Sequence, residues 1–132
     1  MYWRNGKRHK AHECLSRALA IWERALGPAH PLVAWPLSGI GTVLVDQGRL
    51  QEAIGPLERA VSICDTKTCE AGPHGRGLFG LARALAATEA DSQRAIQLAR
   101  QARQEFAKAP YLKKELEEID VWLQEHSRAE MP

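Results

Sequence analysis

The chain has 132 residues, of which 45% are hydrophobic and 26% are charged. This length bounds it to one compact domain or a short array of small structural units, and the apolar content excludes a chain disordered throughout. The formal net charge of +2, from 18 Lys and Arg against 16 Asp and Glu, gives no general attraction to nucleic acid or to anionic lipid.

An internal repeat organises the sequence. Two stretches agree at a constant offset of 42 positions, and Ala95 continues the series 42 residues after Ala53. The matched residues are Gly6, Ala11, Leu15, Arg17, Ala18 and Ile21 in the first copy and Gly48, Ala53, Leu57, Arg59, Ala60 and Ile63 in the second. A fixed period of this length is typical of stacked helical repeats.

Residues 1–26 form only half a repeat. Tyr2 aligns with Leu44 of the next copy, so we expect the chain to begin in the last turn of a first helix, followed by a long second helix over residues 8–26. Its apolar residues would lack the first helix that normally covers them.

Residues 27–66 form a full repeat. The core face of its first helix, residues 34–46, consists of Leu37, Ile40, Gly41 and Leu44. Gly48 is placed to end that helix in the left-handed conformation. Gly41 and Ala53 are the small residues expected where the two helices approach most closely.

Residues 67–108 form a second full repeat, with its first helix over residues 76–88. A capping helix follows within residues 109–132, since Pro110 stops the preceding pattern and a new apolar stripe begins. That stripe is Leu112, Leu116, Ile119 and Leu123, with charged residues on the other faces. A terminal helix of this kind keeps the end of a repeat array soluble.

The spacing of Leu37, Ile40, Gly41, Leu44, Ala53, Leu57 and Ala60 resembles the tetratricopeptide repeat, in its longer kinesin-light-chain type. With Val33-Ala-Trp-Pro-Leu37 and the tail from Leu116 to Trp122, the chain is also similar to C-terminal repeat regions of bacterial serine/threonine kinases of the myxobacterial kind. The resemblance implies an all-α solenoid of antiparallel helix pairs and a non-catalytic protein–protein interaction module. It further implies the carboxy-terminal part of a larger bacterial signalling protein.

First helices of successive repeats line the concave side of such a solenoid. The residues expected to face this groove are Trp35, Ser38, Thr42, Val45, Arg76, Phe79 and Arg83. Aromatic residues beside two arginines suit an acidic peptide, which is the partner we expect. The alternative is that Trp35 and Phe79 only pack on each other.

Self-association is a second possible function. The apolar stripe of the N-terminal helix would be exposed without its partner helix, and large exposed apolar patches are uncommon on monomers. A homodimer would form through Tyr2, Trp3, Leu15, Leu19 and Trp22.

The sequence matches nucleotide-binding and metal-binding motifs only weakly. Gly75, Gly77 and Gly80 match G-x-G-x-x-G, but no strand precedes them, so we interpret them as a loop that leads into a helix. His9, His12 and Cys14 are too few for a closed zinc site, which leaves a small metal-dependent enzyme as a remote alternative. We therefore expect no enzyme activity and no cofactor.

Three cysteines, Cys14, Cys64 and Cys69, do not make a disulfide-rich secreted scaffold and favour a reducing, cytoplasmic location with free thiols. The polar, basic start leads into no signal-peptide apolar segment. The longest uncharged run, residues 25–45, contains prolines, and its apolar part is too short to span a membrane. We expect neither membrane nor nucleic acid as a partner.

Overall fold

The computed structural model describes the backbone of residues 2–88 and 92–130, and the side chains of residues 7–88 and 92–127. The elements in this part of the chain are α1 (Tyr2–Leu26), α2 (Ala34–Asp46), α3 (Leu50–Thr66), α4 (Ala71–Ala87), α5 (Ser92–Ala107) and α6 (Lys113–Glu130), with 3-10 turns at Pro31–Val33 and Pro110–Leu112. No strand occurs in the described residues. The predicted all-α class is confirmed.

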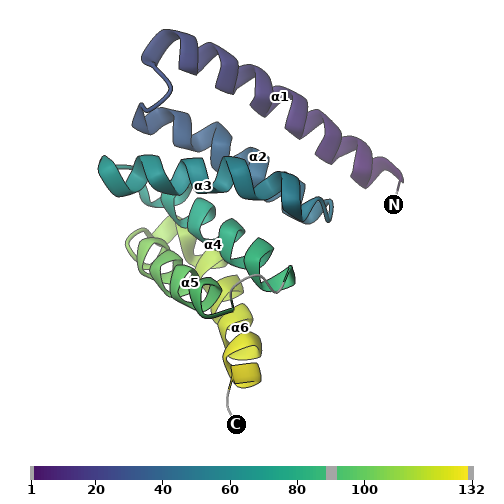
Figure 1. Ribbon diagram of the computed structural model, residues 1–132, viewed down its shortest axis with the longest axis vertical. Coiled ribbons are helices and arrows are strands. Elements are labelled where there is room, and N and C mark those ends of the chain that lie inside the picture. The colour runs from purple at the N-terminus through teal and green to yellow at the C-terminus, as the bar shows by residue number, and fades with distance from the viewer. Residues whose placement is uncertain (1, 89–91, 131–132) are drawn as a thin grey trace.

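The helices stack one after another along the long axis of the molecule, with α1 at one end and α6 at the other (Figure 1). α2 packs on α3, and α4 packs on α5, as antiparallel pairs. Each pair also contacts the next, because α4 lies against both α2 and α3, and α6 lies against α5. This succession of helix pairs is the solenoid that the repeat predicted.

Glycines with positive φ end two of the helices. Gly48 has φ +77° between α2 and α3, and Gly27 has φ +95° after α1. Residues other than glycine rarely adopt this backbone conformation, so the sequence specifies both turns.

Directly after Gly48, Arg49 donates to both carboxylate oxygens of Glu52 at 2.6 and 2.7 Å. This hydrogen bond lowers the pKa of Glu52 at the start of α3.

Leu57 fills the closest contact between three helices. It is fully buried on α3 and faces two glycines, Gly41 on α2 and Gly80 on α4. A Cβ atom added at Gly80 would lie 2.8 Å from Leu57 Cδ2, and one added at Gly41 would overlap Leu57 Cγ. The predicted close approach at Gly41 is therefore present, although Leu57 rather than Ala53 meets it.

Two helix boundaries differ from the predictions. α1 runs without interruption from Tyr2 to Leu26, so the expected helix end near Gly6 is wrong. α4 begins at Ala71, five residues before the predicted start, because its first turn holds Gly72 and Pro73, both buried against the rest of the fold. The four-part division of the chain itself stays a prediction.

The early start of α4 also changes the interpretation of the glycine motif. Gly75, Gly77 and Gly80 all lie buried inside this helix, not in a loop before it. A Cβ atom added at Gly75 would lie 2.5 Å from the ring of Phe106 on α5, and one at Gly77 would lie 3.4 Å from Ala60. The motif therefore allows helices to approach each other.

Within the described residues, no helix is both long enough and apolar enough to cross a membrane.

Candidate functional site

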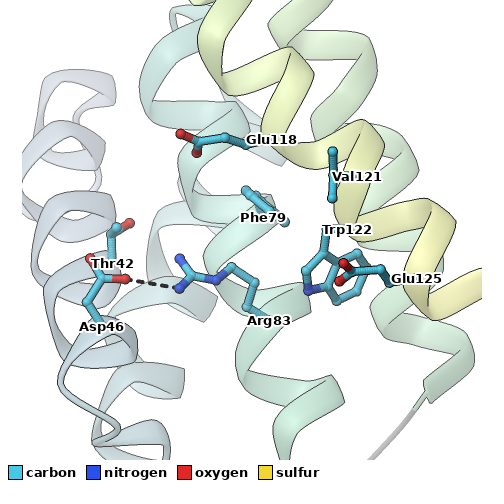
Figure 2. Close-up of a pocket in the computed structure, with 8 residues that line it drawn as sticks. All are labelled: Thr42, Asp46, Phe79, Arg83, Glu118, Val121, Trp122 and Glu125. Carbon is cyan, nitrogen blue, oxygen red and sulfur yellow. Dashed lines mark hydrogen bonds and ion pairs between the residues drawn. The ribbon is translucent and has the colours of Figure 1, made fainter.

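An open hollow of about 390 Å³ lies where side chains of α2, α4 and α6 meet (Figure 2). Its lining residues are Thr42, Asp46, Phe79, Arg83, Glu118, Val121, Trp122 and Glu125. They come from three helices that are distant in the sequence, so only the stacking of the repeats brings them together. We call this space the first hollow.

Arg83 forms the α4 wall of the first hollow and is held in place. Its Nη2 donates to Asp46 Oδ1 on α2 at 3.0 Å, and its guanidinium lies 5.7 Å from the centre of the Phe79 ring (Figure 2). A paired guanidinium over an aromatic ring has lost part of its capacity to receive an anion. Arg83 therefore joins two walls of the hollow rather than standing free.

Aromatic rings connect α4 with α6. Phe79 meets Trp122 edge to face, with ring centres 5.9 Å apart, and meets Phe106 at 6.4 Å in the same manner. Trp122 also stacks on His126, with ring centres 3.8 Å apart. His126 Nδ1 donates to the Trp122 carbonyl oxygen at 2.8 Å, which fixes the imidazole one turn along the helix. These contacts hold the indole in one orientation.

A second hollow of about 400 Å³ adjoins the first, and Arg83 and Trp122 are common to both. Its other lining residues are Val45, Gly48, Leu50, Ala86, Ala87 and His126. Because His126 belongs only to the second hollow, the stacked face of the indole borders that space. The two hollows thus meet at Arg83 and Trp122, and together we call them the groove.

Carboxylates dominate the charge of the first hollow. Its described lining residues include three carboxylates, Asp46, Glu118 and Glu125, and one cationic side chain, Arg83. Their formal charges sum to −2. Neither Glu118 nor Glu125 makes an ion pair with another described residue. The groove is therefore acidic, which is opposite to the sign expected from Arg76 and Arg83.

Of the predicted groove residues, four line the two hollows. Thr42, Phe79 and Arg83 line the first, and Val45 lines the second. Ser38 does not face the groove: it is 1% exposed, and its Oγ donates to the Trp35 carbonyl oxygen at 3.1 Å. Ser38 lies on the buried face of α2, where its hydroxyl group is satisfied by the backbone of its own helix.

Trp35 and Arg76 form a separate contact, which lies outside both hollows. The Arg76 guanidinium lies 5.9 Å from the centre of the Trp35 ring, and the same indole packs beside Gly72. Phe79 pairs with Phe106 and Trp122 instead of Trp35. The alternative of a Trp35–Phe79 contact is thus wrong for the described residues.

Sequence reasoning missed the contribution of α6, which it treated only as a cap. The four-residue apolar stripe accounted for the contact with α5, and Trp122 and Val121 lie beside that stripe. The apolar face of α6 is therefore wider than one neighbouring helix can cover. This width was the signal that could have predicted a second contact. Trp122 uses this additional width to reach Phe79 on α4.

The predicted self-association stripe points into the molecule. Leu15 and Leu19 pack on the main core, and Leu19 and Trp22 pack on a smaller cluster around Leu37. Contact with α2 and the following turn buries them in part, so they are less exposed than the dimer hypothesis required. The side chains of Tyr2 and Trp3 lie outside the described residues. The large exposed apolar side chains in the described part of α1 are Ile21, at 64%, and Leu26, at 42%.

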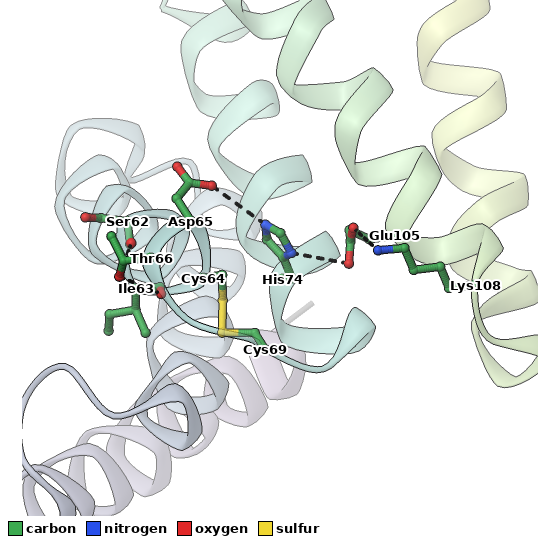
Figure 3. A network of polar contacts seen from close by, with 9 residues as sticks. All are labelled: Ser62, Ile63, Cys64, Asp65, Thr66, Cys69, His74, Glu105 and Lys108. Carbon is green, nitrogen blue, oxygen red and sulfur yellow. Dashed lines mark hydrogen bonds and ion pairs between the residues drawn. A yellow bond between two sulfur atoms is a disulfide. The ribbon is translucent and has the colours of Figure 1, made fainter.

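Cys64 and Cys69 form a disulfide that joins the end of α3 to the segment before α4 (Figure 3). The expectation of loop thiols at these positions is wrong, and the cysteines no longer argue for a reducing compartment, since disulfides persist in oxidising ones. Cys14 is free and exposed.

Beside the disulfide, a polar cluster connects three helices. His74 Nδ1 lies 3.2 Å from Glu105 Oε1, and Glu105 also pairs with Lys108 at 2.6 Å (Figure 3). Asp65 Oδ1 lies 4.0 Å from the other nitrogen of His74. Every member has a partner from α3, α4 or α5, so this cluster joins helices.

The residues considered for a metal do not converge. His9 lies 3.8 Å from Glu13, and His12 approaches Ser16 at 3.5 Å, one turn away along α1 in each case. Over the part of the chain that the structure describes, no group of three or more His, Cys, Asp or Glu side chains could hold an ion.

Comparison with known proteins agrees with the repeat architecture. The solved structures that match include two crystal structures of nearly identical TPR-like repeats from a Podosopora anserina protein assigned as a kinesin light chain, one of them a point variant. Each has a TM-score of 0.64 and 26% identity, over 95% of this chain and 64% of the other. The chain thus spans less than two thirds of those proteins. No curated protein sequence matches it.

The family model described as Tetratricopeptide repeat matches residues 1–66, which is half of the chain. The helix-pair stacking extends the same architecture beyond that range, through α4 and α5. This protein therefore belongs to the tetratricopeptide repeat family.

Proposed function

We propose that this chain is a non-catalytic scaffold that binds a segment of a partner protein in the groove formed by the first and second hollows. The observation that supports this most is the convergence of Thr42, Arg83 and Trp122 from three helices on one open space. Aromatic and arginine side chains in a concave site are typical of interaction hot spots. The two structural relatives have TPR-like repeats as well.

A place within a larger bacterial signalling protein is part of the same proposal. It is supported by the sequence resemblance to kinase-linked repeat regions, and a scaffold that brings a partner to a catalytic domain would suit that context. An acidic partner is disfavoured, because Arg83, which lines the hollow, is paired with Asp46. Homodimerisation through Leu15, Leu19 and Trp22 is disfavoured as well, since these side chains pack within the chain.

Panning a displayed library of random peptides on the full chain tests the proposal. Thr42→Tyr places a large side chain in the first hollow and should abolish binding of the selected peptides. Gln104→Tyr places the same side chain at an exposed position on α5 and should leave binding unchanged. Peptides that bind equally to both variants would contradict the groove as the binding site.

A further inference from the structure

We infer that the occupant of the groove is a cationic segment of a partner protein, with a Lys or Arg side chain beside Trp122 between Glu118 and Glu125. This inference rests on the proposed function and adds the chemistry of the partner. It is carried by the placement of charges around the first hollow.

Glu118 and Glu125 bracket the indole along one helix. Trp122 follows Glu118 by four residues and precedes Glu125 by three, so all three side chains share one face of α6. Seven residues of α-helix span roughly 10 Å, with the indole between the two carboxylates. All three residues line the same hollow (Figure 2).

Trp122 lines that hollow together with Phe79, whose ring it meets edge to face. His126, which stacks on the indole, lines only the second hollow, so no described ring that lines the first hollow is stacked on Trp122. Tryptophan is the aromatic residue that attracts cations most strongly. A guanidinium or ammonium placed there would also lie within reach of a carboxylate on either side.

The α4 wall of the first hollow offers no unpaired positive charge to an anionic partner. Arg83 is the only lining residue of the first hollow with a positive charge, and Asp46 pairs with it at 3.0 Å. An acidic segment would face three carboxylates and one engaged arginine. A basic segment would face two carboxylates that have no ion-pair partner in the described part of the chain. Charge complementarity therefore favours the basic segment.

Matched substitutions at Val121 test this inference directly. Val121 is 56% exposed and lines the first hollow, so that a long side chain there enters the hollow without disturbing the core. The probes are short fluorescein-labelled peptides that share their leucine positions and carry Arg, Gln or Glu at the remaining positions. Binding to the full chain is measured by fluorescence anisotropy at about 50 mM and about 300 mM salt.

We expect the Arg peptide to bind on the order of 10-fold more tightly than the Glu peptide at low salt, with the difference shrinking at high salt. Val121→Arg should weaken binding of the Arg peptide, whereas Val121→Glu, similar in bulk, should preserve or strengthen it. Glu117→Arg, which is exposed on α6 outside the hollow, serves as the control and should change little.

Equal binding of the three peptides, or equal weakening by Val121→Arg and Val121→Glu, would overturn the cationic occupant. The library result with Thr42→Tyr would still decide the proposed function separately. Failure of the Arg peptide to bind would also overturn the inference. Loss of all binding by Glu117→Arg would place the charge preference elsewhere on α6 and contradict it as well.

Discussion

At the scale of single residues, the fold depends on positions that have no side chain. Leu57 packs between α2 and α4 because Gly41 and Gly80 leave room for it, and Phe106 packs on α4 because of Gly75. Interiors are packed so densely that one added methyl group is felt. These glycines are therefore part of the core, although glycine inside a helix is unfavourable in itself.

Gly41→Ala should destabilise the protein by about 1 to 3 kcal/mol, because the new methyl group overlaps Leu57 Cγ and forces the helices apart. Gly55→Ala is the matched control, since a Cβ atom at Gly55 would have nothing within 4 Å apart from its chain neighbours. The helix propensity of alanine is offset there by the ring of Pro56, which follows directly, so stability should change by less than about 1 kcal/mol. Urea unfolding measures both, and a Gly41→Ala midpoint at or above the Gly55→Ala midpoint would contradict this packing.

At the scale of elements, the joint between the two full helix pairs is reinforced covalently. The Cys64–Cys69 disulfide has a sequence separation of 5 and closes the turn from α3 to α4. In the chain-entropy account, even so short a loop contributes about 2 kcal/mol by restricting the unfolded chain. Cys64 is buried, so serine substitution would add a packing cost of its own.

A reducing agent isolates the contribution of the bridge. We expect it to lower the free energy of unfolding by about 2 kcal/mol in a Cys14→Ser background, which removes the exposed third thiol. A Cys64→Ala/Cys69→Ala variant should be less stable and should not respond to the reductant. Identical urea midpoints with and without reductant in the Cys14→Ser protein would show that the disulfide does not stabilise this joint.

Helix periodicity predicted much of the element structure. The stripe around Leu37 and the turn glycine Gly48 located α2 and its end, because both depend on local sequence. The continuity of α1 through Gly6 was not predictable from the repeat, since the alignment of Gly6 with the turn glycine Gly48 indicated a helix end there. The start of α4 and the glycine motif depended on packing against α2 and α5, which spacing alone does not reveal.

The groove was predicted only on one side. Thr42, Phe79 and Arg83 followed from the helical register of α2 and α4, whereas Glu118, Trp122 and Glu125 depended on where α6 packs. The sign of the site charge was wrong for the same reason. A residue pair such as Arg83 with Asp46 joins different repeats, and the pairing decides whether the arginine is free.

At the scale of the whole molecule, stability should decrease toward the N-terminal end. No residue in the described part of α1 from residue 7 to 26 is fully buried, whereas α3, α4 and α5 each contribute several buried residues. α1 packs on α2 and the adjoining turn along one side only. In repeat arrays, each unit is stabilised chiefly by its neighbours, and an end unit has fewer.

Hydrogen exchange should therefore show α1 opening before the central helices. We expect its backbone amides to exchange by local opening, while those of α3 and α4 exchange only in the global unfolding reaction. Mass spectrometry of peptic fragments measures this difference, with urea stability as the reference for the global value. Protection of α1 equal to that of α4 would contradict a graded solenoid.

The central claim is that a partner segment binds in the groove beside Trp122, and the four tryptophan indole N–H signals in a nitrogen–proton correlation spectrum test it most directly. Trp22 packs between α1 and α2, and Trp35 lies outside both hollows, whereas Trp122 lines both of them. Titration with a library-selected peptide should shift the Trp122 signal, assigned through a Trp122→Phe variant, and leave the Trp22 signal in place. A peptide that binds and shifts the Trp22 signal while leaving Trp122 unmoved would contradict the account.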